Sequence, residues 1–215
     1  MLNEPLHVAV LCSKRAPGLD ALLRHPSRGI VYDVDVIMTT ESAYANHDVP
    51  VIPYPIVSFY GGAPIGDREI RRRYDARTAG YLELLGIDVV LTLGYLYVIT
   101  EPFLTKFRDR IFNIHDSDVP RYPGLHATRD AIVAGEQSTF SSVHIVTSEL
   151  DGGPVIARSD PFPVAAFARE AARRGHNDIV SAYAYAQREW MMRSAWGDLA
   201  VQALEQRVGL REAVA

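Results

Sequence analysis

The sequence of 215 residues is short of cysteine, lysine and long hydrophobic runs. Its only cysteine, Cys12, excludes an internal disulfide and fits a reducing compartment. No apolar run approaches the roughly 20 residues that a membrane-spanning helix needs, and residues 1–5 lack the regions of a signal peptide. The formal net charge of -4 lacks the basic excess of a nucleic-acid binder. We therefore expect a soluble, cytoplasmic protein with no membrane or nucleic-acid partner.

What the sequence does contain is enough apolar material for a substantial core. Hydrophobic residues make up 48% of the chain, as in soluble globular domains. A chain of 215 residues is near the upper end of one ordinary domain. Because no internal repeat, low-complexity segment or linker interrupts it, we expect a single domain over residues 1–215.

Short apolar, β-branched runs alternate with helical patterns over the first half of the chain. Strands are expected over residues 7–12, 32–39, 49–52, 88–93 and 111–115. Helices are expected over 19–23, 67–85 and 101–107, with a loop over 54–66 that is rich in proline and glycine. This alternation predicts an α/β protein with an open, mostly parallel, Rossmann-like sheet and helices on both faces.

The second half begins with a loop to residue 125 and a helix to residue 134. Two more strands are expected over 140–147 and 155–158, joined by a tight Asp151-Gly152-Gly153-Pro154 turn. The tail from 165 to about 206 is rich in alanine and arginine and is expected to be helical.

Two polar side chains mark the end of the strand at 111–115. Side chains alternate faces along a strand, so Asn113 and His115 project to the same side. The carboxyl end of a parallel strand is where α/β sheets place their ligands. The alternative interpretation is two surface residues at a strand end. The turn at Asp151 would place one carboxylate near the same end of the sheet.

Four blocks between about residues 88 and 160 resemble the signatures of folate-dependent formyltransferases, most closely those of the glycinamide ribonucleotide transformylases. They keep the order and spacing of that family. The blocks are Asn113-Ile114-His115, Pro120-x-x-Pro123-Gly124-Leu125-His126, Ser142-Val143-His144-x-Val146-Thr147 and Asp151-Gly152-Gly153-Pro154-Val155-Ile156.

The resemblance implies that Asn113, His115 and Asp151 are the catalytic residues. In this reaction an amine attacks the formyl carbon of 10-formyltetrahydrofolate and produces a tetrahedral oxyanion. Asn113 and His115 can donate hydrogen bonds to that oxygen. Asp151 can orient or stabilise His115 and help to move the proton from the amine to the leaving nitrogen.

The same resemblance places a folate pocket after the strand at 88–93. Backbone groups there would read the polar edge of the pterin, while apolar side chains form the walls. The expected residues are Tyr95, Leu96, Tyr97, Val98, Ile99 and Leu150. Tyr97 stands where the transformylases often have arginine. The alternative is ordinary core packing at a strand end.

The expected acceptor site departs from the family. The transformylases carry a Gly-x-Gly-Ser-Asn loop that holds a phosphate on backbone amides, whereas this chain has Cys12-Ser13-Lys14-Arg15-Ala16-Pro17-Gly18. Ser13, Lys14 and Arg15 are candidate phosphate ligands, with a solvated basic turn as the alternative. Glu189 is a further candidate acceptor contact, and residues 40–48 are too few for a long helix.

Other kinds of site are less well supported by the sequence. Cys12, at the end of a buried strand, reads as a small core residue rather than a nucleophile. No short metal-ligand spacing and no Gly-x-Gly-x-x-Gly motif are present, so neither a metal nor a dinucleotide is expected. His126 and His144 are expected to make structural hydrogen bonds near the site.

The resemblance therefore predicts a 10-formyltetrahydrofolate-dependent formyltransferase of one-carbon metabolism and purine biosynthesis. The acceptor is a small amine, with glycinamide ribonucleotide, an amino sugar nucleotide and an amino-acid derivative as candidates. We expect neither the β-rich C-terminal domain of the transfer-RNA enzymes nor the N-terminal domain of the formyltetrahydrofolate hydrolases, because the chain reads as helix after residue 165 and its first expected strand begins at residue 7. Hydrolase activity, a non-catalytic folate-binding module and a homodimer stay open.

Overall fold

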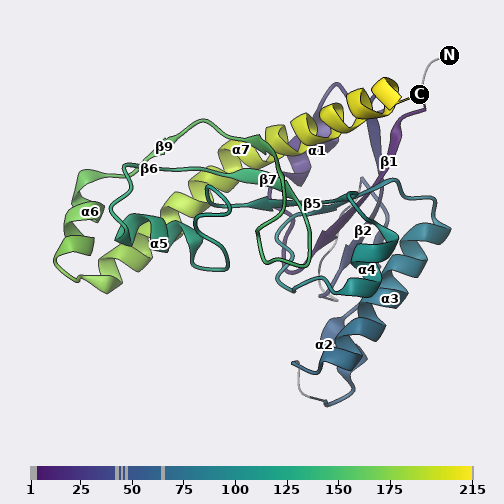
Figure 1. Ribbon diagram of the computed structural model, residues 1–215, viewed down its shortest axis with the longest axis horizontal. Helices are drawn as coiled ribbons and strands as arrows, with labels where there is room; N and C mark the ends of the chain where they lie inside the picture. Colours follow the sequence, from purple (N-terminus) through teal and green to yellow (C-terminus); the bar gives the residue numbers. More distant parts are fainter. Residues whose placement is uncertain (1–3, 42–43, 45, 47, 64–65, 215) are drawn as a thin grey trace.

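The computed structural model describes residues 4–41, 44, 46, 48–63 and 66–214, with side chains up to residue 209. Seven strands form its main sheet in the order β3-β2-β1-β4-β5-β7-β8 (Figure 1). Their bounds are β1 Leu6–Cys12, β2 Tyr32–Thr39, β3 Val51–Pro53, β4 Val89–Thr92, β5 Ile111–His115, β7 Ser142–Ile145 and β8 Val155–Arg158. The first five are parallel, while β7 and β8 run antiparallel to their neighbours. The expected open, mostly parallel α/β sheet is confirmed.

Helices cover both faces of this sheet, as predicted. On one face lie α1 (Leu19–Arg24) and the long α7 (Asn177–Val214). On the other lie α3 (Arg68–Leu84) and α4 (Glu101–Lys106). Figure 1 shows α7 crossing the molecule from α6 at one end to α1 at the other.

The alternation of β1 explains why both layers form. Val8, Val10 and Cys12 pack in the core that includes α1 and α7. Ala9 and Leu11 point the other way, into the core of α3 and α4. Because every side chain from Val8 to Cys12 is at most 1% exposed, the strand reads as one continuous apolar run.

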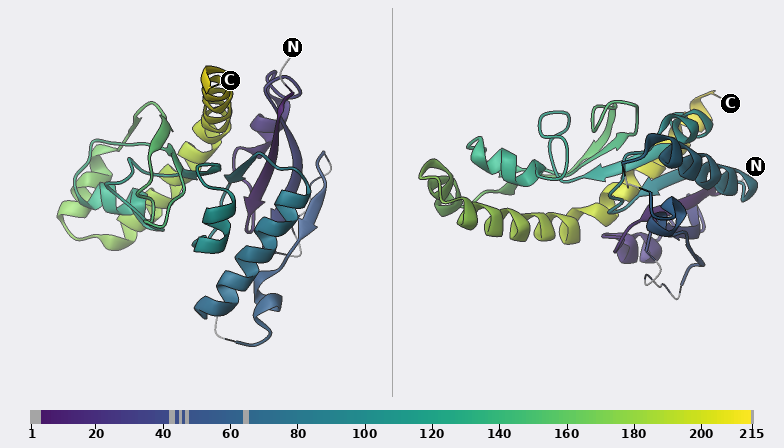
Figure 2. Two further views of the ribbon diagram at one scale, coloured as in Figure 1. Left: turned by 45° about the vertical axis from the view of Figure 1, so that its right-hand side comes forward. Right: turned by 90° about the horizontal axis from the view of Figure 1, so that it is seen from below.

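A smaller group of elements lies on the side of the molecule away from α3 (Figure 2). It consists of α5 (Ala127–Val133), α6 (Ala166–Arg173) and the first turns of α7, which share a buried cluster around Ile132 and Val180. A two-stranded sheet, β6 (Ser138–Thr139) with β9 (Phe162–Pro163), lies beside it.

Three details differ from the sequence-based expectations. The expected loop over 54–66 contains the short helix α2 (Ile56–Tyr60), which buries Ile56 and Tyr60 against Tyr74. The helical tail is divided into α6 and α7 because Gly175 adopts a φ of +74°, in the left-handed region. The strand expected over 140–147 is shorter, and β6 precedes it as a separate strand.

Two expectations fall wholly or partly on residues that lie outside the described ones. The segment 40–48 includes 42–43, 45 and 47, and the N-terminal segment 1–5 includes 1–3. Among the described residues, no helix has both the length and the apolar character needed to cross a bilayer.

Candidate active site

The carboxyl ends of β4 and β5 open into a pocket of about 470 Å³, which we call the reaction pocket. It is lined by the end of β5, by the segment after β4, and by Arg188 and Trp196 of α7. The loop before α5 and the turn before β8 complete it. Parallel strands commonly present ligand-binding residues at this edge.

The three expected catalytic residues all line the reaction pocket. Asn113 and His115 lie on the same face of β5, as the strand alternation predicts, and Asp151 reaches them from the turn before β8. His115 Nε2 lies 3.6 Å from Asp151 Oδ2 and 3.3 Å from the carbonyl oxygen of Tyr122.

The amide of Asn113 is oriented by two neighbours. Its Oδ1 accepts a hydrogen bond of 2.6 Å from the Thr92 hydroxyl, and its Nδ2 lies 3.0 Å from His144 Nε2. His144 Nδ1 lies 3.1 Å from the carbonyl oxygen of Ile145, which can only accept. When His144 is neutral with its proton on Nδ1, Nε2 accepts from Asn113, whereas in the doubly protonated ring Nε2–H faces the carboxylate of Asp151. One N–H of the Asn113 amide then remains for a ligand.

Asp151 is held by a backbone that few residues could adopt. Its own φ is +50°, a left-handed value that aspartate tolerates better than most residues. At Gly153 a side chain is excluded, because a Cβ there would overlap the carbonyl oxygen of Ile145. The turn therefore needs glycine at 153 to present the carboxylate of Asp151 to the pocket.

The electrostatics of Asp151 favour its ionised form. Burial acts to raise its pKa, but the His144 and His115 rings and the Gly124 N–H, at 2.8 Å from Oδ2, hold the pKa at about 2. His144 Nε2 lies 3.6 Å from Oδ1, so its contact with this carboxylate is looser than its contact with Asn113. At neutral pH the pocket therefore contains a fixed negative charge.

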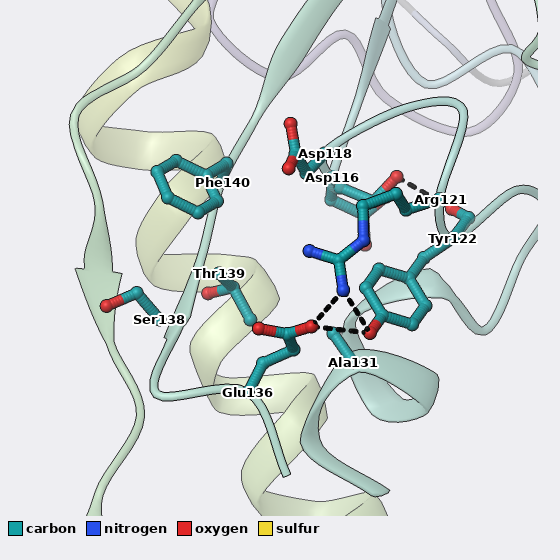
Figure 3. A pocket seen from close by; sticks show the side chains of 10 residues that line it. Asp116, Asp118, Arg121, Tyr122, Ala131, Glu136, Ser138, Thr139 and Phe140 are labelled. Atoms are coloured by element: carbon teal, nitrogen blue, oxygen red, sulfur yellow. Dashed lines mark hydrogen bonds and ion pairs between the residues drawn. The ribbon is translucent and has the colours of Figure 1, made fainter. Parts of the chain in front are cut away.

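The loop between β5 and α5 is tied down at several points. Ser117 Oγ donates to the Tyr122 carbonyl at 2.6 Å, and Ser142 Oγ donates to the Ser117 carbonyl at 2.8 Å. Figure 3 shows Arg121 and Tyr122 both directed at the carboxylate of Glu136, which follows the C-terminal end of α5. These contacts fix the Tyr122 carbonyl that faces His115.

Five of the six expected folate-binding residues line the reaction pocket, namely Tyr95, Leu96, Tyr97, Val98 and Leu150. The sixth, Ile99, is not among the lining residues. It is 6% exposed and packs in the core with Phe103 of α4, which agrees with the alternative of core packing. Leu96, Val98 and Leu150 are exposed, as apolar walls of an open pocket would be.

A buried ion pair holds the segment after β4 in place. Asp75 of α3 is fully buried and accepts hydrogen bonds of 2.7 Å from both the N–H and the hydroxyl of Thr100. Arg71, one helical turn away, contacts Asp75 at 2.7 Å and donates to the Tyr95 hydroxyl at 2.8 Å. Its guanidinium also lies 5.4 Å from the ring centre of Tyr97. Both ends of the segment are thus anchored to α3.

The structure places the four candidate acceptor residues in different surroundings. Ser13 is 1% exposed, and its hydroxyl accepts from the Leu96 N–H at 3.2 Å, so it supports the backbone of the segment after β4. Lys14 is exposed. Arg15 and Glu189 form a two-bond ion pair with each other, beside a separate pocket of about 360 Å³.

Residues that the sequence did not single out for this site also line it or support it. Thr92 orients Asn113 together with His144, whose structural hydrogen bonds near the site were expected, while Asp116 and Arg188 line the pocket and face one another. Antiparallel pairing brings His144 opposite Asn113. That register is not readable from the sequence, although the expected position of His144 near the site agrees with it.

Two other expectations concern residues outside this chemistry. Cys12 is fully buried, and burial raises the pKa of its thiol to about 11 despite the hydrogen bond with Thr39. It packs with the core of α1 and α7. Within the described part of the chain, no group of three or more His, Cys, Asp or Glu side chains is arranged to hold a metal ion.

Comparisons with known proteins point to one family. Residues 6–196 match the formyl transferase family. The chain is 39% identical to the phosphoribosylglycinamide formyltransferase of Escherichia coli (strain K12) over 89 residues, which are 41% of this chain and 42% of that protein. It is 27% identical to the protein of the same name from Mycobacterium tuberculosis (strain CDC 1551 / Oshkosh) over 176 residues, 76% of this chain and 77% of that protein.

Solved structures agree with these sequence matches. The fold is similar to that of glycinamide ribonucleotide transformylase 1 from Symbiobacterium toebii, with a TM-score of 0.65 and 27% identity, covering 87% of this chain and 86% of that one. The alignment with the Escherichia coli protein nevertheless spans less than half of either sequence.

Proposed function

This chain belongs to the formyl transferase family, and on that premise we propose that it transfers the formyl group of 10-formyltetrahydrofolate to a small-molecule amine. The observation that carries the proposal is the convergence of Asn113, His115 and Asp151 in one pocket next to the segment 94–98. Attack of the amine nitrogen on the formyl carbon forms a new C–N bond. Cleavage of the bond to N10 then releases tetrahydrofolate and the formylated amine.

Asn113 and His115 would stabilise the oxyanion that forms in between. The Asn113 amide has one N–H that the network with Thr92 and His144 leaves unused. An imidazole N–H of His115 can supply a second hydrogen bond to the same oxygen. Donors that are already oriented before the reaction lose little energy in reorganisation, and one such donor typically contributes about 10²–10³ in turnover.

Asp151 would act mainly through its charge. A carboxylate with a pKa of about 2 is a weak base at neutral pH, so it is suited to stabilising positive charge on His115 or on the attacking nitrogen. The proton that the amine loses must reach N10 of the leaving folate. Asp151 can pass that proton on, directly or through water, without retaining it.

The donor would bind along the wall after β4. Backbone groups of the segment 94–98 would hold the pterin edge, between the apolar side chains of Leu96, Val98 and Leu150. The acceptor amine would approach from the side of α7. Glycinamide ribonucleotide is one candidate acceptor, which would place the reaction in purine biosynthesis.

We predict that Asp151→Asn lowers kcat by about 10²–10⁴-fold, because the substitution removes the charge next to His115 and leaves the shape of the side chain. The measurement is formation of tetrahydrofolate from 10-formyltetrahydrofolate with a panel of amines that includes glycinamide ribonucleotide. The matched control is Asp160→Asn, a substitution of an exposed aspartate in the segment after β8, which should leave kcat unchanged. Full activity of Asp151→Asn would remove this residue from the mechanism.

The same assay separates the alternatives. Release of formate without any amine would identify a hydrolase, in which water takes the place of the acceptor. Binding of folate with no turnover would identify a binding module. The expected single catalytic domain, cytoplasmic location and homodimer stay predictions, and light scattering in solution tests the last of these.

A further inference from the structure

A second pocket of about 350 Å³ adjoins the reaction pocket between α5 and α7. The two pockets share Asp116, Leu125, His126 and Arg188 in their linings. A ligand whose amine reaches Asn113 and His115 can therefore extend into this second pocket without leaving the protein surface. We call it the α5–α7 pocket.

The polar lining of the α5–α7 pocket is biased toward positive charge. It contains two arginines and a single carboxylate, together with neutral hydrogen-bonding groups from both helices. The polar residues that matter here are Asp116, His126, Thr128, Arg129, Tyr185 and Arg188.

The one carboxylate is already partnered. Asp116 is 4% exposed and accepts a hydrogen bond of 2.7 Å from the Thr128 hydroxyl. Its Oδ2 also lies 3.0 Å from Nε of Arg188. This contact neutralises Asp116 and holds Arg188 from one side, although the Nε–H bond is not directed at the carboxylate. The two terminal nitrogens of the guanidinium remain as donors.

The second arginine is more weakly engaged. Arg129 contacts the carboxylate of Asp130 and the side-chain oxygen of Asn177, both at 3.5 Å. At that distance each contact is at the outer limit of a hydrogen bond. An anion in the α5–α7 pocket would therefore meet the guanidinium of Arg188, which Asp116 holds in place, and that of Arg129, which would lose only weak contacts on binding.

The other charged region near the site is differently arranged. There Arg15 donates two hydrogen bonds to Glu189, so both charges of that pair are already satisfied. An anion that bound Arg15 would have to compete with Glu189. Neither Arg129 nor Arg188 has such a two-bond partner among the described residues, because Arg188 faces Asp116 only through Nε and Arg129 contacts Asp130 only at 3.5 Å.

We propose that the acceptor amine carries an anionic group, either a carboxylate or a phosphate, which binds Arg129 and Arg188 in the α5–α7 pocket. This inference rests on the proposed formyl transfer. It assigns the acceptor a chemical class and a direction, with the amine at His115 and the anion between the two helices.

The test uses two pairs of amines, and each pair has one anionic and one neutral member. Glycine and glycinamide differ in a carboxylate, and 2-aminoethyl phosphate and 2-aminoethanol differ in a phosphate. Their KM values in formyl transfer, and their binding to the folate-free protein by calorimetry, are compared for the unchanged chain and for Arg129→Gln. The control is Arg173→Gln on α6, whose side chain is 76% exposed.

We expect the anionic member of at least one pair to bind more tightly than its neutral partner. Loss of a charge-assisted hydrogen bond in Arg129→Gln should weaken binding of that anion by about 10- to 100-fold, with the neutral amines and the KM for 10-formyltetrahydrofolate unchanged. The pair with the larger difference identifies carboxylate or phosphate. The double variant Asp116→Asn/Arg188→Gln, which leaves no unpaired buried charge, should weaken binding in the same way.

Equal binding of charged and neutral partners, or unchanged anion binding in both variants, would overturn the pocket assignment while formyl transfer could stand. Conversely, anion binding that is lost in Arg129→Gln, in a protein that neither binds folate nor formylates any amine, would support the pocket and contradict the proposed function. The calorimetric measurement of amine binding therefore tests the α5–α7 pocket even where no turnover occurs.

Discussion

At the scale of single residues, Asp151 combines an unusual backbone with an unusual ionisation state. Two imidazoles and the Gly124 N–H stabilise its charge against the opposing effect of burial. The pKa of Asp151 is about 2 in the folded protein, below the roughly 3.9 of an unfolded aspartate. Ionisation of Asp151 therefore stabilises the folded state. This stabilisation is fully present above pH 4 and is lost as the pH falls toward 2.

We therefore predict that Asp151→Asn destabilises the protein at neutral pH by about 2 kcal/mol, since one pKa unit corresponds to about 1.4 kcal/mol. The free energies of unfolding of the variant and the unchanged protein should converge between pH 4 and pH 2. Urea unfolding at several pH values measures this. A constant difference across the range would contradict the pKa assigned to Asp151.

At the scale of elements, the turn between β7 and β8 requires a residue without a side chain at position 153. A Cβ at Gly153 would overlap the carbonyl oxygen of Ile145 at the end of β7. Gly153→Ala should push the two strands apart, destabilise the protein by roughly 1–3 kcal/mol or more, and displace Asp151 enough to lower kcat.

The matched control is Gly80→Ala in the middle of α3, where a Cβ would meet nothing within 4 Å. That substitution should stabilise the protein by about 0.5–1 kcal/mol with kcat unchanged, because alanine favours a helix over glycine. Thermal unfolding and steady-state rates measure both variants. Normal activity and stability in Gly153→Ala would show that the turn can relax.

The segment after β4 gives a second prediction at this scale. Burial raises the pKa of Asp75 despite Arg71 and Thr100, so desolvation weakens the ion pair and we interpret its role as geometric. Asp75→Asn alone should cost about 3–5 kcal/mol, because a buried charge on Arg71 loses its partner. The double variant Arg71→Met/Asp75→Leu should recover most of that stability.

The same double variant separates stability from binding. Without the contacts to Tyr95 and Thr100 the segment loses both anchors, so the KM for 10-formyltetrahydrofolate should rise while kcat at saturation changes little. A double variant with an unchanged KM would show that the ion pair does not position the folate segment. The substitution Tyr95→Phe, which removes only the hydroxyl, should give a smaller effect of the same kind.

Most elements could be predicted from the sequence, and the reasons are local. The strands β1, β2, β5 and β8 are apolar or alternating runs bounded by turn residues, so their periodicity is visible. In contrast, α2 spans Ile56–Tyr60 inside a segment rich in proline and glycine. Its five residues are too few for a helical period, and its stability comes from packing on Tyr74.

The parts of the site that could not be predicted depend on contacts between distant residues. Arg15 and Glu189 are 174 positions apart, and each was expected to bind substrate, whereas the structure pairs them with each other. The contact between Asp116 and Arg188 could not be predicted, because it forms only when α7 lies across the end of β5. Strand alternation, by contrast, was sufficient to place Asn113 and His115 on one face.

At the scale of the whole molecule, the reaction pocket combines segments that lie between residues 94 and 196 of the sequence. A ligand that binds only the folded protein raises its stability by RT ln(1 + [L]/Kd), about 2.7 kcal/mol at 100 times Kd. For a domain of this size we expect tetrahydrofolate at that concentration to raise the Tm by roughly 5–10 °C.

Leu96→Asp, which places a charge in the apolar wall of the pocket, should reduce that rise in Tm. The matched control is Leu84→Asp, at a leucine of α3 that is 86% exposed, where the rise should be retained. Differential scanning fluorimetry measures all three proteins. An equal rise in both variants would place tetrahydrofolate elsewhere.

The position of α7 affects how the chain can fold while it is being synthesised. This helix follows β1 and α1 in the chain by more than 150 positions, yet it covers their apolar side chains and also supplies Arg188 and Trp196 to the reaction pocket. On the ribosome, the growing chain has to keep that early surface from aggregating until α7 emerges. Asn113, His115 and Asp151 are synthesised before the residues of α7 that line the same pocket, so the complete pocket can form only after α7 has been made.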